Sequence, residues 1–345
     1  MSHPLLFREI AMPQCEPKTQ PLSCASGAPK CLIAAPDAGD ILAALVHQGL
    51  LTPAQVHVAV TSAEVAQYIG EVDIVCGKPA WLAPHLHLAQ KLRWLQSTFA
   101  GVEPLMVAGL PRNYQLTGVK GIFGPLMREY VFGKLLEIFR HFGCYHRQQQ
   151  QTLWRPHAYQ GLAGRTLMVV GLGSIGAELV HTGQHFGMRT LGVNSTGQSG
   201  LPLDGCYALD DLQQGVGSDA LASADAIVFA LPGTPALTGV VDAQFLKALK
   251  PGAVLVNVGR GQLIDERALL AALKAGQLQA AVLDVFTQEP LPEDHPFWRA
   301  PNLHLTPHIS ALTFTADIAR IFADNYQRFQ AGKPLLHAID FARGY

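Results

Sequence analysis

The chain has 345 residues, of which 49% are hydrophobic and 15% are charged, and its formal net charge is -1. This length and composition predict a globular enzyme of two domains, because each half is long enough to bury a core of its own. The sequence has no basic run and no apolar stretch near the roughly 20 residues that cross a bilayer, which argues against a nucleic-acid surface and a membrane span. We therefore expect a cytoplasmic protein whose partners are small molecules, not nucleic acids or membranes.

Six cysteines lie at positions 15, 24, 31, 76, 144 and 206. They form no CxxC pair and no spacing typical of a metal site, so we expect reduced, mostly buried thiols and no metal. His85 and His87 could suggest a metal pair, but no cysteine or carboxylate cluster accompanies them. One exposed and one packed histidine is the simpler interpretation.

The first half of the chain indicates an α/β domain. Residues 1–28 are rich in proline, serine and cysteine, and we interpret them as a loosely ordered extension. Short apolar segments that favour strands then alternate with helical segments, one of them at 64–69; the predicted strands are 30–35, 56–60, 74–76 and 92–97. A long helix is predicted to begin near Pro125, because apolar residues recur there at helical spacing.

The second half opens with a glycine-rich segment, GLGSIG at 171–176, between an apolar run at 167–170 and a helical pattern. In such a unit the glycines allow a tight turn, close approach of phosphates and close helix packing, and the helix N-terminus attracts anions. Further buried strands are predicted at 190–193, 226–231, 253–258, 280–285 and 303–306, with a closing helix at Thr315–Gln330. A dinucleotide site is therefore expected mid-chain, where two domains meet.

Three charged or ionisable residues follow successive predicted strands: Arg260, Glu289 and His308. Each alone is most simply interpreted as a surface loop residue. Ligands of doubly wound sheets, however, bind outside the carboxyl ends of the strands, and the chain carries few charges. The three together therefore indicate a functional site.

From about Leu92 to its C-terminus the chain resembles the D-isomer-specific 2-hydroxyacid dehydrogenase family. The resemblance rests on the glycine-rich segment and on four later motifs in the order of the family: Leu231-Pro232 with Thr234 and Thr238, Gly259-Arg260-Gly261, Asp284-Val285-Phe286 with Glu289-Pro290-Leu291, and Pro307-His308. Residues 195–196 and 342–345 look most similar to the glyoxylate/hydroxypyruvate reductases.

The resemblance implies a Rossmann-type doubly wound parallel sheet at 125–313, plus a flavodoxin-like substrate domain at 29–124 and 314–345. It also implies a homodimer that forms through the nucleotide domain.

The activity implied is reduction of a small 2-oxo acid to the D-2-hydroxy acid. His308 would act as general acid and base, because an imidazole exchanges protons near neutral pH, and Glu289 would orient its ring. The planar guanidinium of Arg260 would bind the carboxylate and carbonyl oxygen of the substrate. Backbone N–H groups at Ala100, Gly101 and Val102 would complete the carboxylate site, although the residues by themselves equally fit a simple turn.

The resemblance assigns a longer set of residues to the cofactor, NADP or NAD. They are Gly171, Gly173, Ser174, Ile175, Gly176, Asn194, Ser195, Thr196, Leu231, Pro232, Thr234, Thr238, Val258, Asp284 and His308. Asp284 would hold the nicotinamide carboxamide, although a helix cap would also explain it. Turn formation would explain the residues around Pro232 equally well.

The end of the strand at 190–193 departs from the usual NAD pattern. An NAD site normally carries Asp or Glu about 20 residues after the glycines, to bind the ribose 2′-hydroxyl. Here Asn194, Ser195 and Thr196 follow the strand, and no acidic residue occurs between Glu178 and Asp204. We therefore predict a preference for NADP with NAD tolerated, although no Arg or Lys stands in this loop to pair with a 2′-phosphate.

Two other functions remain open from the sequence. The protein could be a dinucleotide-sensing module that binds other proteins, which would not need an intact Arg, Glu and His together. It could also be a dehydrogenase of the same fold for another substrate, such as formate or phosphite.

Overall fold

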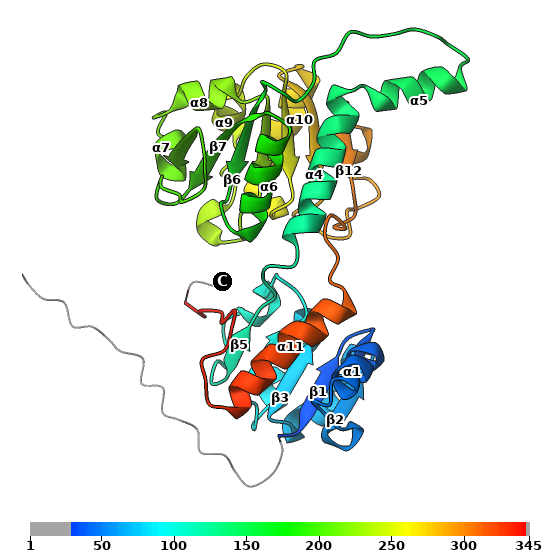
Figure 1. Ribbon diagram of the computed structural model, residues 1–345, viewed down its shortest axis with the longest axis vertical. Coiled ribbons are helices and arrows are strands. Elements are labelled where there is room, and N and C mark those ends of the chain that lie inside the picture. The colour runs from blue at the N-terminus through cyan, green and yellow to red at the C-terminus, as the bar shows by residue number, and fades with distance from the viewer. Residues whose placement is uncertain (1–28, 343–345) are drawn as a thin grey trace, which may run out of the picture.

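The chain folds into two bodies, each built on one parallel sheet, in a computed structural model that describes residues 29–342 (Figure 1). The expected extension at 1–28 lies outside the described residues. The first sheet has the order β2-β1-β3-β4-β5 and comprises β1 (Cys31–Ala34), β2 (Val56–Ala59), β3 (Ile74–Gly77), β4 (Trp94–Ser97) and β5 (Gln115–Thr117). This is the flavodoxin-like order that the sequence predicts.

The second sheet has the order β12-β11-β10-β9-β6-β7-β8. Its strands are β6 (Thr166–Val170), β7 (Arg189–Asn194), β8 (Gly205–Ala208), β9 (Ala226–Phe229), β10 (Ala253–Asn257), β11 (Leu278–Leu283) and β12 (Leu303–Leu305). The order reverses between β6 and β9, as in a doubly wound Rossmann sheet, so the predicted fold class is confirmed.

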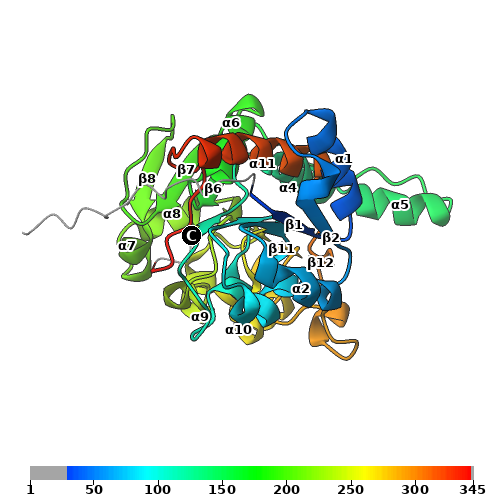
Figure 2. The same ribbon diagram turned by 90° about the horizontal axis from the view of Figure 1, so that it is seen from below.

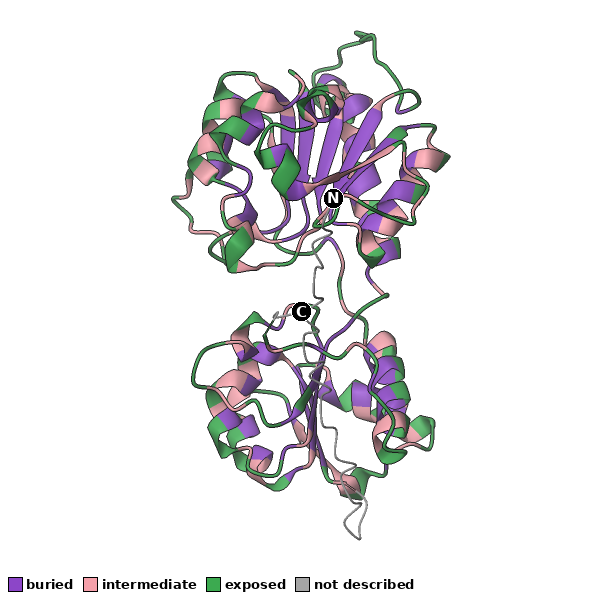
Figure 3. Ribbon diagram, turned by 90° about the vertical axis from the view of Figure 1, so that its left-hand side faces the viewer, coloured by how far each residue is buried: buried purple, intermediate pink, exposed green. Residues whose placement is uncertain are grey.

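Helices cover both faces of the sheets (Figure 2). They are α1 (Ala38–His47), α2 (Ser62–Tyr68), α3 (Pro79–Leu82), α4 (Gly124–Phe139), α6 (Ser174–His185), α7 (Leu209–Gln213), α8 (Ser218–Ser223), α9 (Ala243–Ala248), α10 (Glu266–Lys274) and α11 (Thr315–Gln330), whereas α5 (Phe142–Gln150) projects from the second body. The central strands are therefore buried on both sides (Figure 3), which explains why they are apolar throughout. No helix in the described part of the chain is long and apolar enough to cross a membrane.

The sequence analysis did not predict two strands, β5 and β8. β5 has three residues and the four residues of β8 are all partly exposed, so neither sequence contains an apolar run long enough to indicate a strand. The remaining predicted strands are present, each shifted by no more than two residues at either end.

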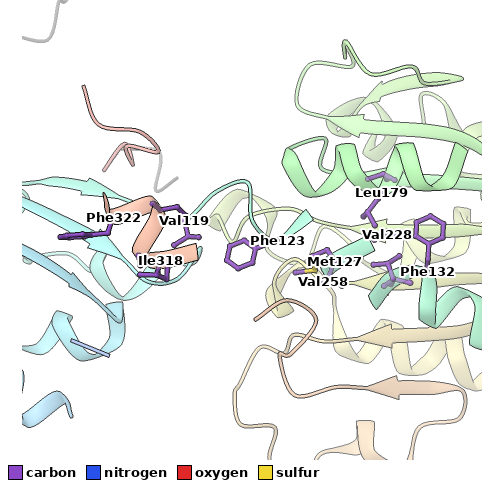
Figure 4. Packing of buried hydrophobic residues seen from close by; sticks show 14 of the residues in the cluster. Val119, Phe123, Met127, Phe132, Leu179, Val228, Val258, Ile318 and Phe322 are labelled. Carbon is purple, nitrogen blue, oxygen red and sulfur yellow. The ribbon is translucent and has the colours of Figure 1, made fainter. Parts of the chain in front are cut away.

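Two chain segments join the bodies, and a hydrophobic cluster runs along them. Phe123 and Met127 are buried between the two sheets, with Val119 and Ile318 on one side and Val258 on the other (Figure 4). Each large apolar side chain buried in this way contributes about 2 kcal/mol. Helix α11 returns to pack against α1 of the first body. We propose the domain boundaries expected above, with 29–124 and 314–345 as one domain and 125–313 as the other.

The four described cysteines are free. Cys31 and Cys76 are fully buried; burial raises the pKa of the Cys31 thiol to about 12 and raises the pKa of Cys76 further, so both remain protonated. Cys144 and Cys206 are partly buried, and Cys15 and Cys24 lie outside the described residues. Among residues 29–342 no three His, Cys, Asp or Glu side chains gather as a metal site.

Candidate active site between the two sheets

The glycine-rich turn lies where the strand order of the second sheet reverses. Gly171 follows β6 with a φ of +103°, and a Cβ there would lie 2.5 Å from the carbonyl oxygen of Ala230 at the end of β9. A Cβ on Gly176 would overlap the carbonyl of Gly171. Gly173, in contrast, has open space where its Cβ would be. Two glycines thus permit the backbone path, and the third leaves room for a ligand.

Helix α6 begins directly after Gly173, with Ser174 and Ile175 in its first turn. No side chain caps this N-terminus, so its N–H groups are available to an anion. The turn at 171–176 and the start of α6 together form a cradle. It fits the pyrophosphate of a dinucleotide, because its free N–H groups attract an anion and the open space at Gly173 leaves room for it.

The residues that follow β7 form a turn that is held by hydrogen bonds of its own. The Oδ1 of Asn194 accepts hydrogen bonds from the N–H groups of Thr196 (3.0 Å) and Gly197 (2.8 Å), and its Nδ2 donates to the carbonyl of Gln198 (2.6 Å). The Asn194 amide thus builds the loop, and the Thr196 hydroxyl also bonds within it, to Asn194 Oδ1 (3.3 Å) and to the carbonyl of Gln198 (3.4 Å). The exposed Ser195 is therefore the side chain of this turn that is most open to a ribose.

The loops after β9 and β10 lie against each other next to this cradle. A Cβ on Gly259 would lie 2.7 Å from the carbonyl oxygen of Leu231. Three residues of the first loop, Pro232, Thr234 and Thr238, are exposed or half-buried, whereas Val258 is buried beneath the second loop. These expected cofactor residues therefore line one continuous edge of the sheet.

Arg260 reaches across from the second body to the first. Its Nε donates to Oε1 of Glu103 at 2.7 Å, and its Nη1 donates to the carbonyl of Gly259 at 2.8 Å. Nη2 has no acceptor within residues 29–342 and points toward Gly101, since a Cβ on Gly101 would lie 2.7 Å from it. The Glu103 side chain is 49% exposed, so the ion pair contributes at most about 1 kcal/mol of stability, and its main effect is to fix the guanidinium.

The loop after β4 presents unpaired donors beside this guanidinium. In the described chain, no acceptor meets the backbone N–H of Ala100, Gly101 or Val102. Nη2 of Arg260 thus lies beside Gly101 in a loop whose N–H groups are unpaired, and such a set of donors suits a carboxylate. Glu103 is the site residue that the sequence analysis missed; its only signal was its position at the end of this loop.

His308 and Glu289 form a hydrogen-bonded pair at the carboxyl ends of β11 and β12. Nδ1 of His308 lies 2.8 Å from Oε2 of Glu289, and Oε1 of Glu289 accepts from the N–H of Phe286 at 2.9 Å. Nε2 of His308 has no partner in the described chain, and the side chain is 52% exposed. The imidazole is therefore oriented by one nitrogen and free to exchange a proton through the other.

His308 itself adopts a left-handed backbone conformation, with a φ of +54°. For a residue other than glycine this conformation costs about 1 kcal/mol or more and persists only where neighbouring contacts hold it. Its N–H donates to the backbone carbonyl of Asp284 at 2.8 Å.

Asp284 is completely buried. Its carboxylate accepts hydrogen bonds from Thr306 Oγ1 (2.6 Å) and from the N–H groups of Ile309 and Ser310 (both 2.9 Å). Both oxygens are therefore used to hold the loop that carries His308. The expected contact of this carboxylate with a nicotinamide carboxamide remains a prediction.

A cavity of about 510 Å³ adjoins the pair of His308 and Glu289. Phe286, Leu291 and Trp298 give it a mostly apolar wall. Trp298 is 55% exposed, whereas Phe297 is buried, so only the first of these aromatic rings borders the site.

Comparison with known proteins places the chain in one family. Residues 132–310 match the family described as D-isomer specific 2-hydroxyacid dehydrogenase, NAD binding domain. Glyoxylate/hydroxypyruvate reductase A of Serratia proteamaculans is 33% identical over 275 residues, which cover 77% of this chain and 86% of that protein.

Solved structures extend the likeness to both bodies. A D-isomer specific 2-hydroxyacid dehydrogenase family protein of Aeromonas salmonicida has a TM-score of 0.84 and 46% identity, covering 91% of this chain and all of that chain. The NADPH-dependent glyoxylate/hydroxypyruvate reductase of Sinorhizobium meliloti, solved with NADP and sulfate, has a TM-score of 0.78 and 25% identity, covering 92% of this chain and all of that chain.

We predict that Gly101→Ala weakens the binding of small carboxylates. The new Cβ would lie 2.6 Å from Oε2 of Glu103 and 2.7 Å from Nη2 of Arg260, so the guanidinium must shift. We expect the Kd for oxalate, measured by calorimetry, to rise about tenfold, because a misplaced Arg loses most of a charge-assisted hydrogen bond. Gly39→Ala is the control, since its Cβ meets open space; an unchanged Kd in Gly101→Ala would contradict the proposed carboxylate site.

Proposed function

The chain belongs to the D-isomer-specific 2-hydroxyacid dehydrogenase family and is an NAD(P)-dependent oxidoreductase, and we propose that it reduces a small 2-oxo acid of the glyoxylate or hydroxypyruvate type to the D-2-hydroxy acid. The observation that carries this proposal is the position of Arg260 Nη2 beside Gly101, in the loop at 100–102 whose N–H groups have no acceptor in the described chain. The relatives named glyoxylate/hydroxypyruvate reductase support the substrate class.

The cradle formed by the turn at Gly171 and the start of α6 would hold the dinucleotide, which supplies a hydride when bound. Arg260 and the loop N–H groups bind the carboxylate and so orient the substrate carbonyl. The charge of Arg260 then stabilises the carbonyl oxygen as negative charge develops on it. His308 donates the proton to this oxygen through Nε2, while Glu289 holds Nδ1 and stabilises the ring.

We expect Arg260→Ala and His308→Ala to lower kcat/KM for glyoxylate and hydroxypyruvate by about 1000-fold or more, since each removes a group that acts on the reacting oxygen. Binding of NADPH, followed by its fluorescence, should change little. Arg267→Ala is the control, because this arginine lies on α10 outside the site.

If either Arg260→Ala or His308→Ala kept most of the wild-type activity, the assigned mechanism would be wrong. A wild-type protein that reduces no 2-oxo acid in a broad panel, yet binds NADPH, would instead favour the dinucleotide-sensing alternative.

We propose that NADP is the preferred cofactor. No carboxylate follows β7 to repel a 2′-phosphate, and Ser195 is exposed there as a neutral donor, whereas the Thr196 hydroxyl bonds within the turn. Relatives from Rhizobium etli, Sinorhizobium meliloti and Xanthobacter autotrophicus were solved with NADP or NADPH.

The wild-type kcat/KM should therefore be about tenfold or more higher with NADPH than with NADH. Ser195→Asp should reverse this ratio, since a carboxylate repels the phosphate and accepts from the ribose hydroxyls. Ser199→Asp, further along the same loop, should not. A wild-type preference for NADH would overturn the proposal.

We propose that the protein forms a homodimer through the arm made of α5 and the residues that follow it. The arm projects from the second body (Figure 1). It exposes large apolar side chains, among them Leu153 at 48% and Trp154 at 98%. Large apolar side chains exposed on a projecting arm are typical of a protein interface.

Light scattering should give twice the chain mass for the wild type. Trp154→Glu should shift the equilibrium toward the monomer, because it places a charge in an apolar contact. A monomeric wild type at micromolar concentration would contradict the dimer.

A further inference from the structure

A tyrosine on α4, Tyr130, is hydrogen-bonded to Thr306 at the start of the loop that carries His308. The hydroxyl of Tyr130 lies 2.5 Å from Oγ1 of Thr306, and Thr306 lies 2.6 Å from Oδ1 of Asp284. Tyr130 comes from the helix that begins at the junction of the two bodies, far along the chain from the other two residues. The contact therefore connects α4 directly to the strand end that precedes His308.

The direction of this hydrogen-bond chain follows from the chemistry of its members. A carboxylate can only accept, so the Thr306 hydroxyl donates its single proton to Asp284. The Thr306 oxygen must then accept from Tyr130, whose hydroxyl is the donor. Burial raises the pKa of Tyr130 to about 12, against the lowering effect of the Thr306 bond, so the hydroxyl keeps its proton at neutral pH.

The same carboxylate fixes the loop on the far side of His308. The N–H groups of Ile309 and Ser310 donate to its two oxygens, and the N–H of His308 donates to the Asp284 carbonyl. Asp284 is thus bonded to the residues on both sides of a strained histidine. Among residues 29–342 the imidazole makes a hydrogen bond to Glu289 alone, so its position depends on this loop.

We propose that Tyr130 is a positioning residue for His308, acting through Thr306 and Asp284. Within the described chain its hydroxyl bonds to Thr306 and not to His308 or Arg260, so it acts by holding the loop that presents Nε2. This inference rests on the proposed function, in which His308 is the proton donor.

Tyr130→Phe tests the inference, with Tyr114→Phe as a matched control. The Tyr114 hydroxyl is buried and has no hydrogen-bond partner in the described chain, so its removal breaks no contact. With glyoxylate and NADPH, we expect Tyr130→Phe to lower kcat about tenfold and to leave both KM values within about twofold, because a small displacement of a catalytic group slows the chemical step. The solvent isotope effect on kcat should rise, since proton transfer from His308 becomes slower.

Two variants of Thr306 distinguish the effect of its hydroxyl group from the effect of its packing. Thr306→Ser keeps the relay and should retain activity within about threefold, whereas Thr306→Val should match Tyr130→Phe or be slower. Hydrogen–deuterium exchange of the full-length protein gives a readout that needs no turnover. Peptides covering 306–310 should exchange about fivefold faster in Tyr130→Phe and unchanged in Tyr114→Phe, because the loop opens locally.

The inference would be overturned if Tyr130→Phe behaved as Tyr114→Phe in kcat, or if exchange of the loop stayed at the wild-type rate. If Tyr130→Phe lost activity together with a general fall in melting temperature, and Thr306→Ser lost as much activity as Thr306→Val, the role would be merely structural. A wild type without any 2-oxo acid reductase activity would overturn the proposed function instead, and the exchange rates would then still decide whether Tyr130 holds the loop.

Discussion

Parallel pairing is the constraint on which the rest of this structure depends. In both sheets the strands run in one direction, so the loops that follow them meet at a single edge of each sheet. The glycine turn, Arg260, Glu289 and His308 all lie in such loops, although more than 130 residues separate the first from the last. Arg260 and Glu103 then join one edge to the other across the gap between the bodies.

The ion pairs of the site are too exposed to contribute much to stability. The His308–Glu289 pair and the Arg260–Glu103 pair each have at least one side chain that is more than a third exposed, and such pairs typically contribute less than about 1 kcal/mol. These pairs act instead by orienting the imidazole of His308 and the guanidinium of Arg260. The stability of the site comes instead from the sheets beneath it and from the buried Asp284, whose carboxylate accepts one hydroxyl and two amide hydrogen bonds.

Much of the fold could be predicted from the sequence because its central strands are apolar throughout and its glycines are placed by steric need. A Cβ at Gly176 would overlap the Gly171 carbonyl, so the motif itself encodes the turn. Edge strands such as β8 bury little and left no comparable pattern. In the site, Arg260, Glu289 and His308 could be identified by position, whereas Glu103 and Tyr130 could not. Their importance depends on partners 157 and 176 residues away, which no local pattern specifies.

The sequence by itself thus determined the fold class, the dinucleotide turn and the charged residues at the strand ends, because each follows from local periodicity, steric limits or side-chain chemistry. The tertiary structure alone decided how these groups are held. It showed that Asn194 is used to build its own turn, and that Asp284 faces inward to the His308 loop. It also placed the free N–H groups at 100–102 beside Arg260. These relations arise from the packing of distant segments, whose geometry is fixed only when both sheets and the junction between them have formed.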